Sequence, residues 1–550
     1  MAQKKSVKNQ EPKLRITVRH ALTNIYTVLL FTAFPLFLSN YYSAARRDKF
    51  WFFLVLTLVI GAAVGIISIV DFAARGNEYN KKLNTYRDPF KVSVTDIAFF
   101  SFAGVSIIST LTCGRIAHCF VGLSGSESNG RNMGLVTILM LLVCYMVISR
   151  FFYYQKLVFY CMFAGIAIVS LLAMLNYYYM DPLGLFDVYK GSSSYDTVIN
   201  DFTSTIGNKN YLSALICVAL PFSVGAALAC EDKIMRIVAY VSTGIQFIGL
   251  LVATSDGGFL GCFAAFAIIA VVISRDSKRL CRFCICIAIM MLSAKLLWLF
   301  DLIMDGKSKG YSSFSEFFVY SNFVYIILTV FAILAVALYF YSKYILNAKD
   351  KAQELPKAVF FIMLGLVCLG FAVVAGLIIY YSCIDTETKL TGFKRFFRFN
   401  EYWGTHRGYF WIRSFEIFGD MNFWQKLFGM GPDTYYFAFK PYFAELSRKF
   451  AEGSTNAAHN VYINYLVTHG ILGLGAYLTL VVSAIVRGVK NSKHNPLALV
   501  CLGVMIAYAA QDIVNIANPV NTPWFIAFIA LSEATALRAN STERLTEAGF

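Results

Sequence analysis

Long apolar runs separated by short polar segments recur along almost the whole chain of 550 residues. A helix needs about 20 predominantly apolar residues to cross the hydrocarbon core of a bilayer. Runs of this kind predict fourteen transmembrane helices, at residues 22–41, 51–73, 93–112, 133–150, 157–178, 210–229, 236–254, 257–274, 283–301, 319–342, 358–382, 460–486, 495–515 and 521–537. Because their boundaries are soft and only Ser255-Asp256 separates two of the runs, we expect 12 to 14 helices.

The composition agrees with this pattern. The chain is 58% hydrophobic and 16% aromatic, with a mean hydropathy of +0.60, and these values exclude a soluble globular protein. We therefore predict an all-α fold, a polytopic transmembrane helical bundle with a large, partly helical external loop.

The distribution of positive charge predicts the topology. Basic residues gather in segments that would be cytoplasmic if the N-terminus is cytoplasmic, as in 1–20 and 275–282. This follows the positive-inside bias of short loops, whereas long loops cross the membrane largely regardless of charge. The exception is residues 383–459, which carry ten Lys/Arg and would lie outside. Charge at the inner surface is explained by anionic lipid, so the charge of 383–459 needs a functional explanation.

These segments define the expected organisation of the chain. Residues 1–20 form a cytoplasmic basic tail, and 21–382 hold the first eleven helices with short loops. Residues 383–459 form the external loop, 460–537 the last three helices, and 538–550 a second cytoplasmic tail. We interpret 21–41 as an uncleaved helix rather than a signal peptide, because further spans follow at once.

The cysteines and acidic residues do not predict a metal site. The thirteen cysteines lie mainly within predicted helices, which argues against a disulfide framework, although Cys113 and Cys119 share an outside loop and could pair. The nearest approach to an acidic metal motif is Asp385-Thr386-Glu387, which we interpret as a solvated charge cluster. No metal and no cofactor is expected.

The segments predicted to face outside carry a series of short polar motifs. In chain order they are Gly130-Arg131-Asn132, Gly207-Asn208-Lys209-Asn210, Ser255-Asp256-Gly257, Arg407, Leu427-Phe428-Gly429-Met430-Gly431, and His459-Asn460 followed by Asn464. Each motif is weak alone, but their order and their common side make the series specific.

This series resembles the O-antigen ligase and O-antigen (polysaccharide) polymerase family of polytopic membrane glycosyltransferases, over about residues 93–535. One position departs from the family pattern, because Asp256 stands where an arginine often follows the serine. A phosphate-binding role for that turn is therefore in doubt, and Arg131 and Arg407 are the better-supported cations.

The resemblance implies an inverting, metal-independent transferase with a fold of the membrane glycosyltransferase type. Its donor would be a glycan on undecaprenyl pyrophosphate. Its acceptor would be a sugar hydroxyl on another lipid-linked glycan, in a polymerase, or on a lipopolysaccharide core or cell-wall glycan, in a ligase. The very aromatic loop and the departure at Asp256 favour a polymerase. The expected location is the bacterial cytoplasmic (inner) membrane, with membrane lipids and a chain-length regulator as candidate partners.

The chemistry of such a transfer suits two residue types found in these motifs. A base must activate the hydroxyl, and His459 suits this task because the unperturbed pKa of histidine is about 6.5. Cations must neutralise the charge that develops on the departing pyrophosphate, and arginine grips phosphate oxygens with a planar fork. We predict His459 and Arg407 as catalytic residues. The predicted substrate-binding residues are Arg131, Asn208, Asn210, Asp256, Gly429, Gly431, Asn460 and Asn464.

Other roles remain open for these residues. His459 could be an ordinary interfacial residue, Arg407 could anchor the loop to lipid headgroups, and Asn208 and Asn210 could cap a helix. Gly429 and Gly431 could serve a tight bend. At the level of the whole protein, the rivals are a transporter or flippase for a lipid-linked or anionic solute, and a scaffold of an envelope assembly. Nucleic acid is not an expected partner, because there is no separate basic domain.

Overall fold

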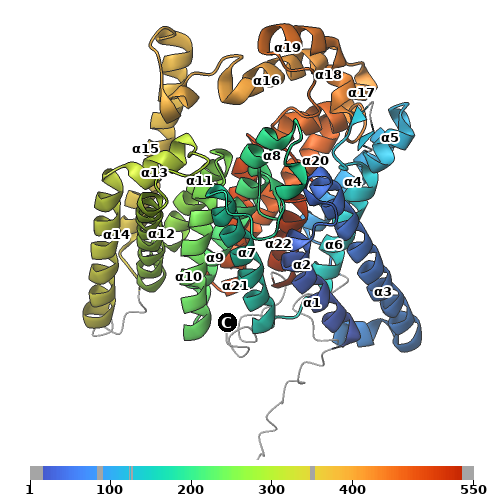
Figure 1. Cartoon of the computed structure of the whole chain (residues 1–550). Helices are drawn as coiled ribbons and strands as arrows, with labels where there is room; N and C mark the ends of the chain where they lie inside the picture. The colour runs from blue at the N-terminus through green and yellow to red at the C-terminus, as the bar shows by residue number, and fades with distance from the viewer. Residues whose placement is uncertain (1–16, 83–90, 123, 126–127, 347–353, 536–550) are drawn as a thin grey trace, which may run out of the picture.

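The computed structural model describes residues 17–122, 124–125, 128–346 and 354–535, except for 83–90. Its long helices form one bundle (Figure 1). The helices of this bundle are α1 (Val18–Phe31), α2 (Ala33–Leu36), α3 (Ala45–Lys82), α4 (Val94–Thr112), α6 (Leu135–Phe151), α7 (Lys156–Tyr177), α9 (Lys209–Ala229), α10 (Lys233–Val252), α11 (Gly257–Ile273), α12 (Ser277–Ile303), α14 (Phe323–Phe340), α15 (Lys357–Ile379), α20 (Val461–Asn491), α21 (Pro496–Gln511) and α22 (Thr522–Thr535).

Short elements connect these helices. They are η1 (Tyr41–Ser43), α5 (Ile116–Val121), η2 (Asp187–Tyr189), α8 (Tyr195–Asp201), α13 (Ser313–Tyr320), η3 (Tyr341–Leu346), η5 (Tyr380–Ile384), η6 (Gly392–Phe397), α16 (Trp403–Asp420), α17 (Phe423–Phe428), α18 (Tyr435–Phe439), η7 (Lys440–Tyr442) and α19 (Phe443–Phe450). Two antiparallel pairs of two-residue strands complete the described chain: β1 (Ser124–Gly125) with β2 (Ser128–Asn129), and β3 (Phe202–Thr203) with β4 (Gly207–Asn208).

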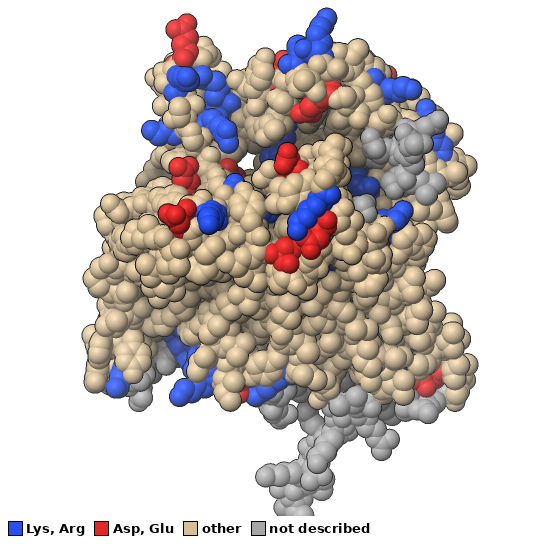
Figure 2. Space-filling view, in the orientation of Figure 1, with Lys and Arg blue, Asp and Glu red and all other residues tan. Residues whose placement is uncertain are grey.

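The helices confirm the prediction of an all-α polytopic membrane protein. Nine helices in the described part of the chain are long and apolar enough to cross a membrane. Three shorter apolar helices, α6, α11 and α21, lie among them. Figure 2 shows a broad band with few charged side chains between a lower fringe and an upper part that carries both signs of charge.

The predicted helix at 22–41 is wrong in one respect, because the chain forms two helices there. α1 ends at Phe31, Thr32 has φ −120° and ψ −70°, and α2 contains Pro35. Proline lacks the N–H that would bond to the carbonyl four residues earlier, and its ring clashes with that carbonyl. Pro35 therefore prevents one continuous helix through Phe31.

Burial varies strongly from helix to helix. Every α9 residue from Leu212 to Ala229 is buried, and α9 packs against α10, α11 and α21. By contrast, α15 has no buried residue along its length. The bundle core therefore lies around α9 and α21, while α15 lies at the periphery.

Residues 383–459 form a folded segment above one end of the bundle, where α16 to α19 lie (Figure 1). This segment has an aromatic core of its own that includes Tyr409, Phe410, Tyr435 and Phe439. Val467 of α20 belongs to the same cluster and ties the segment to the bundle. The segment is thus partly helical, as predicted, and it is held against the start of α20.

Candidate active site

The candidate site lies where the segment 383–459 enters α20. Asn460 caps this helix, because its side chain accepts a hydrogen bond from the Ile463 backbone N–H at 3.0 Å. His459 precedes the cap and has a left-handed backbone, with φ 52°. Its ring stacks on Phe410, with centroids 5.7 Å apart and planes inclined by 22°. The cap and the stacking together fix the direction of the His459 ring.

The surroundings of His459 favour its neutral form. Although the side chain keeps partial contact with solvent, the protein packed around it lowers the pKa of His459 well below the ordinary value. The positive charges of Arg131 and Arg407 lower this pKa further. At neutral pH the ring therefore carries a free nitrogen lone pair, which is the form that a general base requires.

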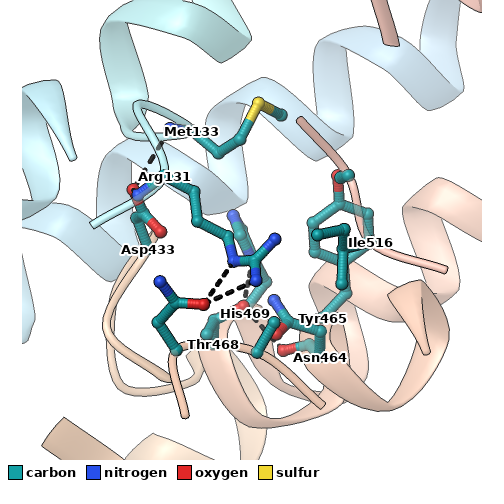
Figure 3. Close-up of a pocket in the computed structure, with 11 residues that line it drawn as sticks. Arg131, Met133, Asp433, Asn464, Tyr465, Thr468, His469 and Ile516 are labelled. Carbon is teal, nitrogen blue, oxygen red and sulfur yellow. Dashed lines mark hydrogen bonds between the residues drawn. The ribbon is translucent and has the colours of Figure 1, made fainter. Parts of the chain in front are cut away.

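Arg131 is buried and held in a fixed orientation. Its Nε and Nη2 atoms donate to the side-chain oxygen of Asn456, at 2.8 and 2.5 Å (Figure 3). Its backbone N–H donates to the Asp433 carboxylate at 2.7 Å, and the Met133 N–H donates to the same oxygen at 3.2 Å. Burial raises the pKa of Asp433, while these two donors oppose the rise. Asp433 therefore fixes the backbone that carries Arg131.

Arg407 differs from Arg131 in having no such partners. Its side chain is partly exposed, and within the described residues it makes no hydrogen bond and no ion pair. Burial lowers the pKa of Arg407 to about 10, and the charge of Asp256 opposes this shift. Arg407 therefore stays charged at neutral pH and is free to bind an anion.

The nearby Arg413 shows what a structural arginine looks like in this segment. Its guanidinium lies 2.6 Å from Glu416, 2.9 Å from Glu445 and 3.7 Å from Glu401. Three carboxylates thus neutralise the charge of Arg413. Arg407, by contrast, has only a longer-range electrostatic interaction with one carboxylate, that of Asp256.

The predicted residues Asn208, Asn210 and Asp256 lie in one connected group. Asn208 caps α9 by accepting from the Asn210 N–H at 2.9 Å, and the Ser255 hydroxyl donates to the Asn210 side-chain oxygen at 2.8 Å. Asp256 accepts from the Phe314 N–H at 3.0 Å. The group joins the starts of α9 and α11 and reaches Arg407 through Asp256. Both asparagines have structural partners, and their contact with substrate stays a prediction.

Gly429 and Gly431 pack against a kink in α20. The kink is at Gly470, with φ 68°, and it leaves carbonyl groups of the preceding turn without helical partners. The N–H between the two glycines donates to Val467 O at 3.1 Å, and the Gly431 N–H donates to Thr468 O at 3.0 Å. A Cβ at Gly429 would lie 2.2 Å from the Thr468 carbonyl carbon. These contacts give both glycines a packing role, and substrate binding by them remains untested.

Arg131 lines a small pocket with room for about one water molecule. Its lining includes Arg131, Asp433, Asn464 and His469 (Figure 3). Asn464 also accepts from the Ala458 N–H at 3.3 Å. Asn456 and Ala457 line the pocket as well, so it adjoins the segment that precedes His459.

Three residues of this region were not predicted as site residues. They are Asn456, Asp433 and His469. Asp433 follows the predicted glycine motif, and Asn456 lies three residues before His459, so both had a signal in their position. His469 lies inside a predicted membrane helix, where a single histidine carries no motif.

The described residues hold no group of three His, Cys, Asp or Glu side chains that could bind a metal ion.

Above the bundle, Figure 2 shows a gap between the upper segment and the helices, with Lys or Arg side chains beside it.

One family model matches the chain. The family is described as O-antigen ligase, and the match covers residues 311–478. Arg407 and His459 lie within the matched range, and Arg131, Asn208 and Asp256 lie outside it. No curated protein matches the chain.

Proposed function

We propose that this chain, whose residues 311–478 match the O-antigen ligase family model, transfers a glycan from undecaprenyl pyrophosphate to an acceptor sugar hydroxyl. The family supports a glycosyltransferase-type role in polysaccharide or lipopolysaccharide assembly. The reaction would take place at the outer face of the bacterial inner membrane, where the segment 383–459 would lie. Polymerisation of lipid-linked repeat units is the reaction we favour, and ligation to a lipopolysaccharide core or cell-wall acceptor is the alternative.

The observation that carries this proposal is the neutral His459 beside two arginines of different kinds. Arg131 is buried and fixed, whereas Arg407 is partly exposed and has no ion-pair partner among the described residues. A proton acceptor next to two cations suits a reaction in which a hydroxyl loses its proton and a pyrophosphate leaves.

The proposed step balances in protons and charge. His459 takes the proton of the acceptor hydroxyl while its oxygen attacks the anomeric carbon of the donor sugar. The bond from this carbon to the pyrophosphate oxygen breaks, so the configuration at the carbon inverts. Arg407 binds the departing pyrophosphate, and the charge of Arg131 helps to stabilise it. The proton then leaves His459 to solvent.

The test compares three variants in membranes supplied with a lipid-linked repeat unit. His459→Ala removes the base, and we expect transfer to fall about 10²–10⁴-fold. Arg407→Ala removes the free cation, and we expect product to be lost while the protein stays folded. His406→Ala is the matched control, because His406 lies in the same segment but pairs with Glu452 at 2.6 Å. Wild-type rates in both His459→Ala and Arg407→Ala would refute the proposal.

The transfer assay separates a polymerase from a ligase, and a transport assay tests the remaining alternative. A glycan ladder formed from the repeat unit alone would identify a polymerase. Product that appears only when a distinct acceptor is added would identify a ligase. Movement of labelled substrate between leaflets of proteoliposomes, without a new glycosidic bond, would instead identify a transporter.

A further inference from the structure

A second histidine lies in the site region and has no part in the proposed step. His469 is the residue before the Gly470 kink of α20, and its side chain is 1% exposed. Its ring stacks on Phe102, with centroids 5.2 Å apart, and meets the edge of Tyr465 at 5.0 Å. Two aromatic neighbours therefore hold the ring in one plane.

The hydrogen bonds of Thr468 determine which ring nitrogen of His469 carries the proton. The Thr468 hydroxyl lies 2.7 Å from the carbonyl oxygen of Asn464 and 2.8 Å from His469 Nδ1. A carbonyl can only accept, and a hydroxyl has one hydrogen to donate. The Thr468 hydrogen therefore goes to Asn464, and Nδ1–H donates to the Thr468 oxygen. In the neutral ring this leaves the lone pair on Nε2.

Arg131, which also lines the pocket, has an unused donor. Arg131 uses Nε and Nη2 on Asn456, while its Nη1 is buried and has no hydrogen-bond partner among the described residues. His469 Nε2 likewise is buried and lacks a partner there. Both residues line the same small pocket (Figure 3). The pocket, which has room for about one water molecule, is thus lined by one residue with an unpaired donor and one with an unpaired acceptor.

We propose that this pocket is a binding site for one hydroxyl group, supplied by water or by a substrate sugar. The oxygen of that group accepts from Arg131 Nη1, and its hydrogen is donated to His469 Nε2. An anion fits less well, because it has no hydrogen for Nε2 and would meet the lone pair of that nitrogen. A hydroxyl satisfies both buried groups, whose unpaired state is costly.

This assignment makes His469 a positioning residue for Arg131. Asn456 holds one edge of the guanidinium, and the bound hydroxyl would hold Nη1. The role in transfer rests on the proposed function, whereas the binding site itself does not.

Two variants separate the hydrogen bond from the packing. His469→Phe keeps an aromatic ring beside Phe102 but removes Nε2. His469→Gln loses the ring but supplies a side-chain carbonyl that can accept from the bound hydroxyl. We expect kcat to fall about tenfold in the Phe variant, with little change in KM, and to recover partly in the Gln variant. If the Phe variant keeps wild-type kcat, or if the Gln variant is no better than the Phe variant, the positioning role is wrong.

A high-resolution structure of the wild-type protein tests the site directly. Density within hydrogen-bond distance of both Arg131 Nη1 and His469 Nε2 in the substrate-free protein would identify water. Density that appears only after an acceptor glycan is added would identify a sugar hydroxyl. An empty pocket in both states would overturn the site. These outcomes do not depend on transfer activity, so they remain distinct from a failure of the His459 assignment.

Discussion

Replacement of Gly429 by alanine tests whether the glycine segment packs against α20 or binds substrate. The added Cβ would lie 2.2 Å from the Thr468 carbonyl carbon and 2.3 Å from both the Thr468 oxygen and the His469 nitrogen. These are backbone atoms, so no side-chain rotation can relieve the contact. Gly429 also has φ 79°, a left-handed conformation that alanine rarely adopts.

The expected cost follows from two contributions. With φ 79° and ψ −171°, Gly429 lies in a region that is essentially confined to glycine, and placing an L-residue there costs about 1–3 kcal/mol. Overpacking of a closely packed contact typically costs a further ~1–3 kcal/mol. We therefore expect Gly429→Ala to lower the free energy of unfolding by about 2–6 kcal/mol, and to weaken the two hydrogen bonds that join residues 430 and 431 to α20.

The assay is thermal unfolding of the purified protein in detergent, measured together with glycan transfer. Gly419→Ala is the control, because Gly419 lies in α16 of the same segment and a Cβ added there would meet no atom of the described chain within 4 Å. That control should unfold at or above the wild-type temperature. A Gly429→Ala protein with wild-type stability and no transfer would refute the packing argument and favour contact with substrate.

Three further predictions concern His459, Asp433 and the Cys113–Cys119 pair. In the proposed reaction the neutral form of His459 is the base, and its pKa is lowered. We therefore expect kcat/KM to stay flat as pH falls through 6.5 and to decline only at lower pH. A pH–rate profile with a midpoint at 6.5 or above would contradict this. Asp433→Asn removes the carboxylate that accepts hydrogen bonds from two backbone N–H groups. We expect the free energy of unfolding, measured by denaturation, to fall by about 1–3 kcal/mol, and glycan transfer to be lost in the activity assay. The Cys113 and Cys119 sulfur atoms lie 3.0 Å apart, so thiol–disulfide exchange with a small oxidised disulfide should link them without loss of activity. Peptide mass analysis checks the link. Unlinked peptides after the treatment would contradict the prediction.

The helices could be predicted well from the sequence because the bilayer leaves few alternatives. Thirteen of the fourteen apolar runs each coincide with one helix of the bundle, and the first run forms α1 and α2. A spanning segment must satisfy its backbone hydrogen bonds within itself, so a run of about 20 apolar residues is sufficient evidence for a helix. The break at Thr32 was predictable in principle, since Pro35 lies within the first run.

The site was predictable only where a role depends on local sequence. Asn460 caps α20 as its place before an apolar run suggests, and Asn208 caps α9. The partners of Arg131 depend on tertiary structure instead. Its contacts to Asp433 and Asn456 join residues 302 and 325 positions apart, and no single sequence reveals such pairs.

Arg131 and Arg407 are not equivalent, and their different contacts suggest different roles in the proposed reaction. A guanidinium that already donates to Asn456, on a backbone fixed by Asp433, cannot move far to meet a substrate. Arg131 would therefore act chiefly through its charge, which is in place before substrate arrives. This charge adds to the effect of burial, the main cause of the lowered pKa of His459. Arg407 has no partner to lose among the described residues, so binding an anion costs it no existing hydrogen bond there. An arriving pyrophosphate would thus be bound by Arg407, while Arg131 sets the field in which His459 accepts the proton.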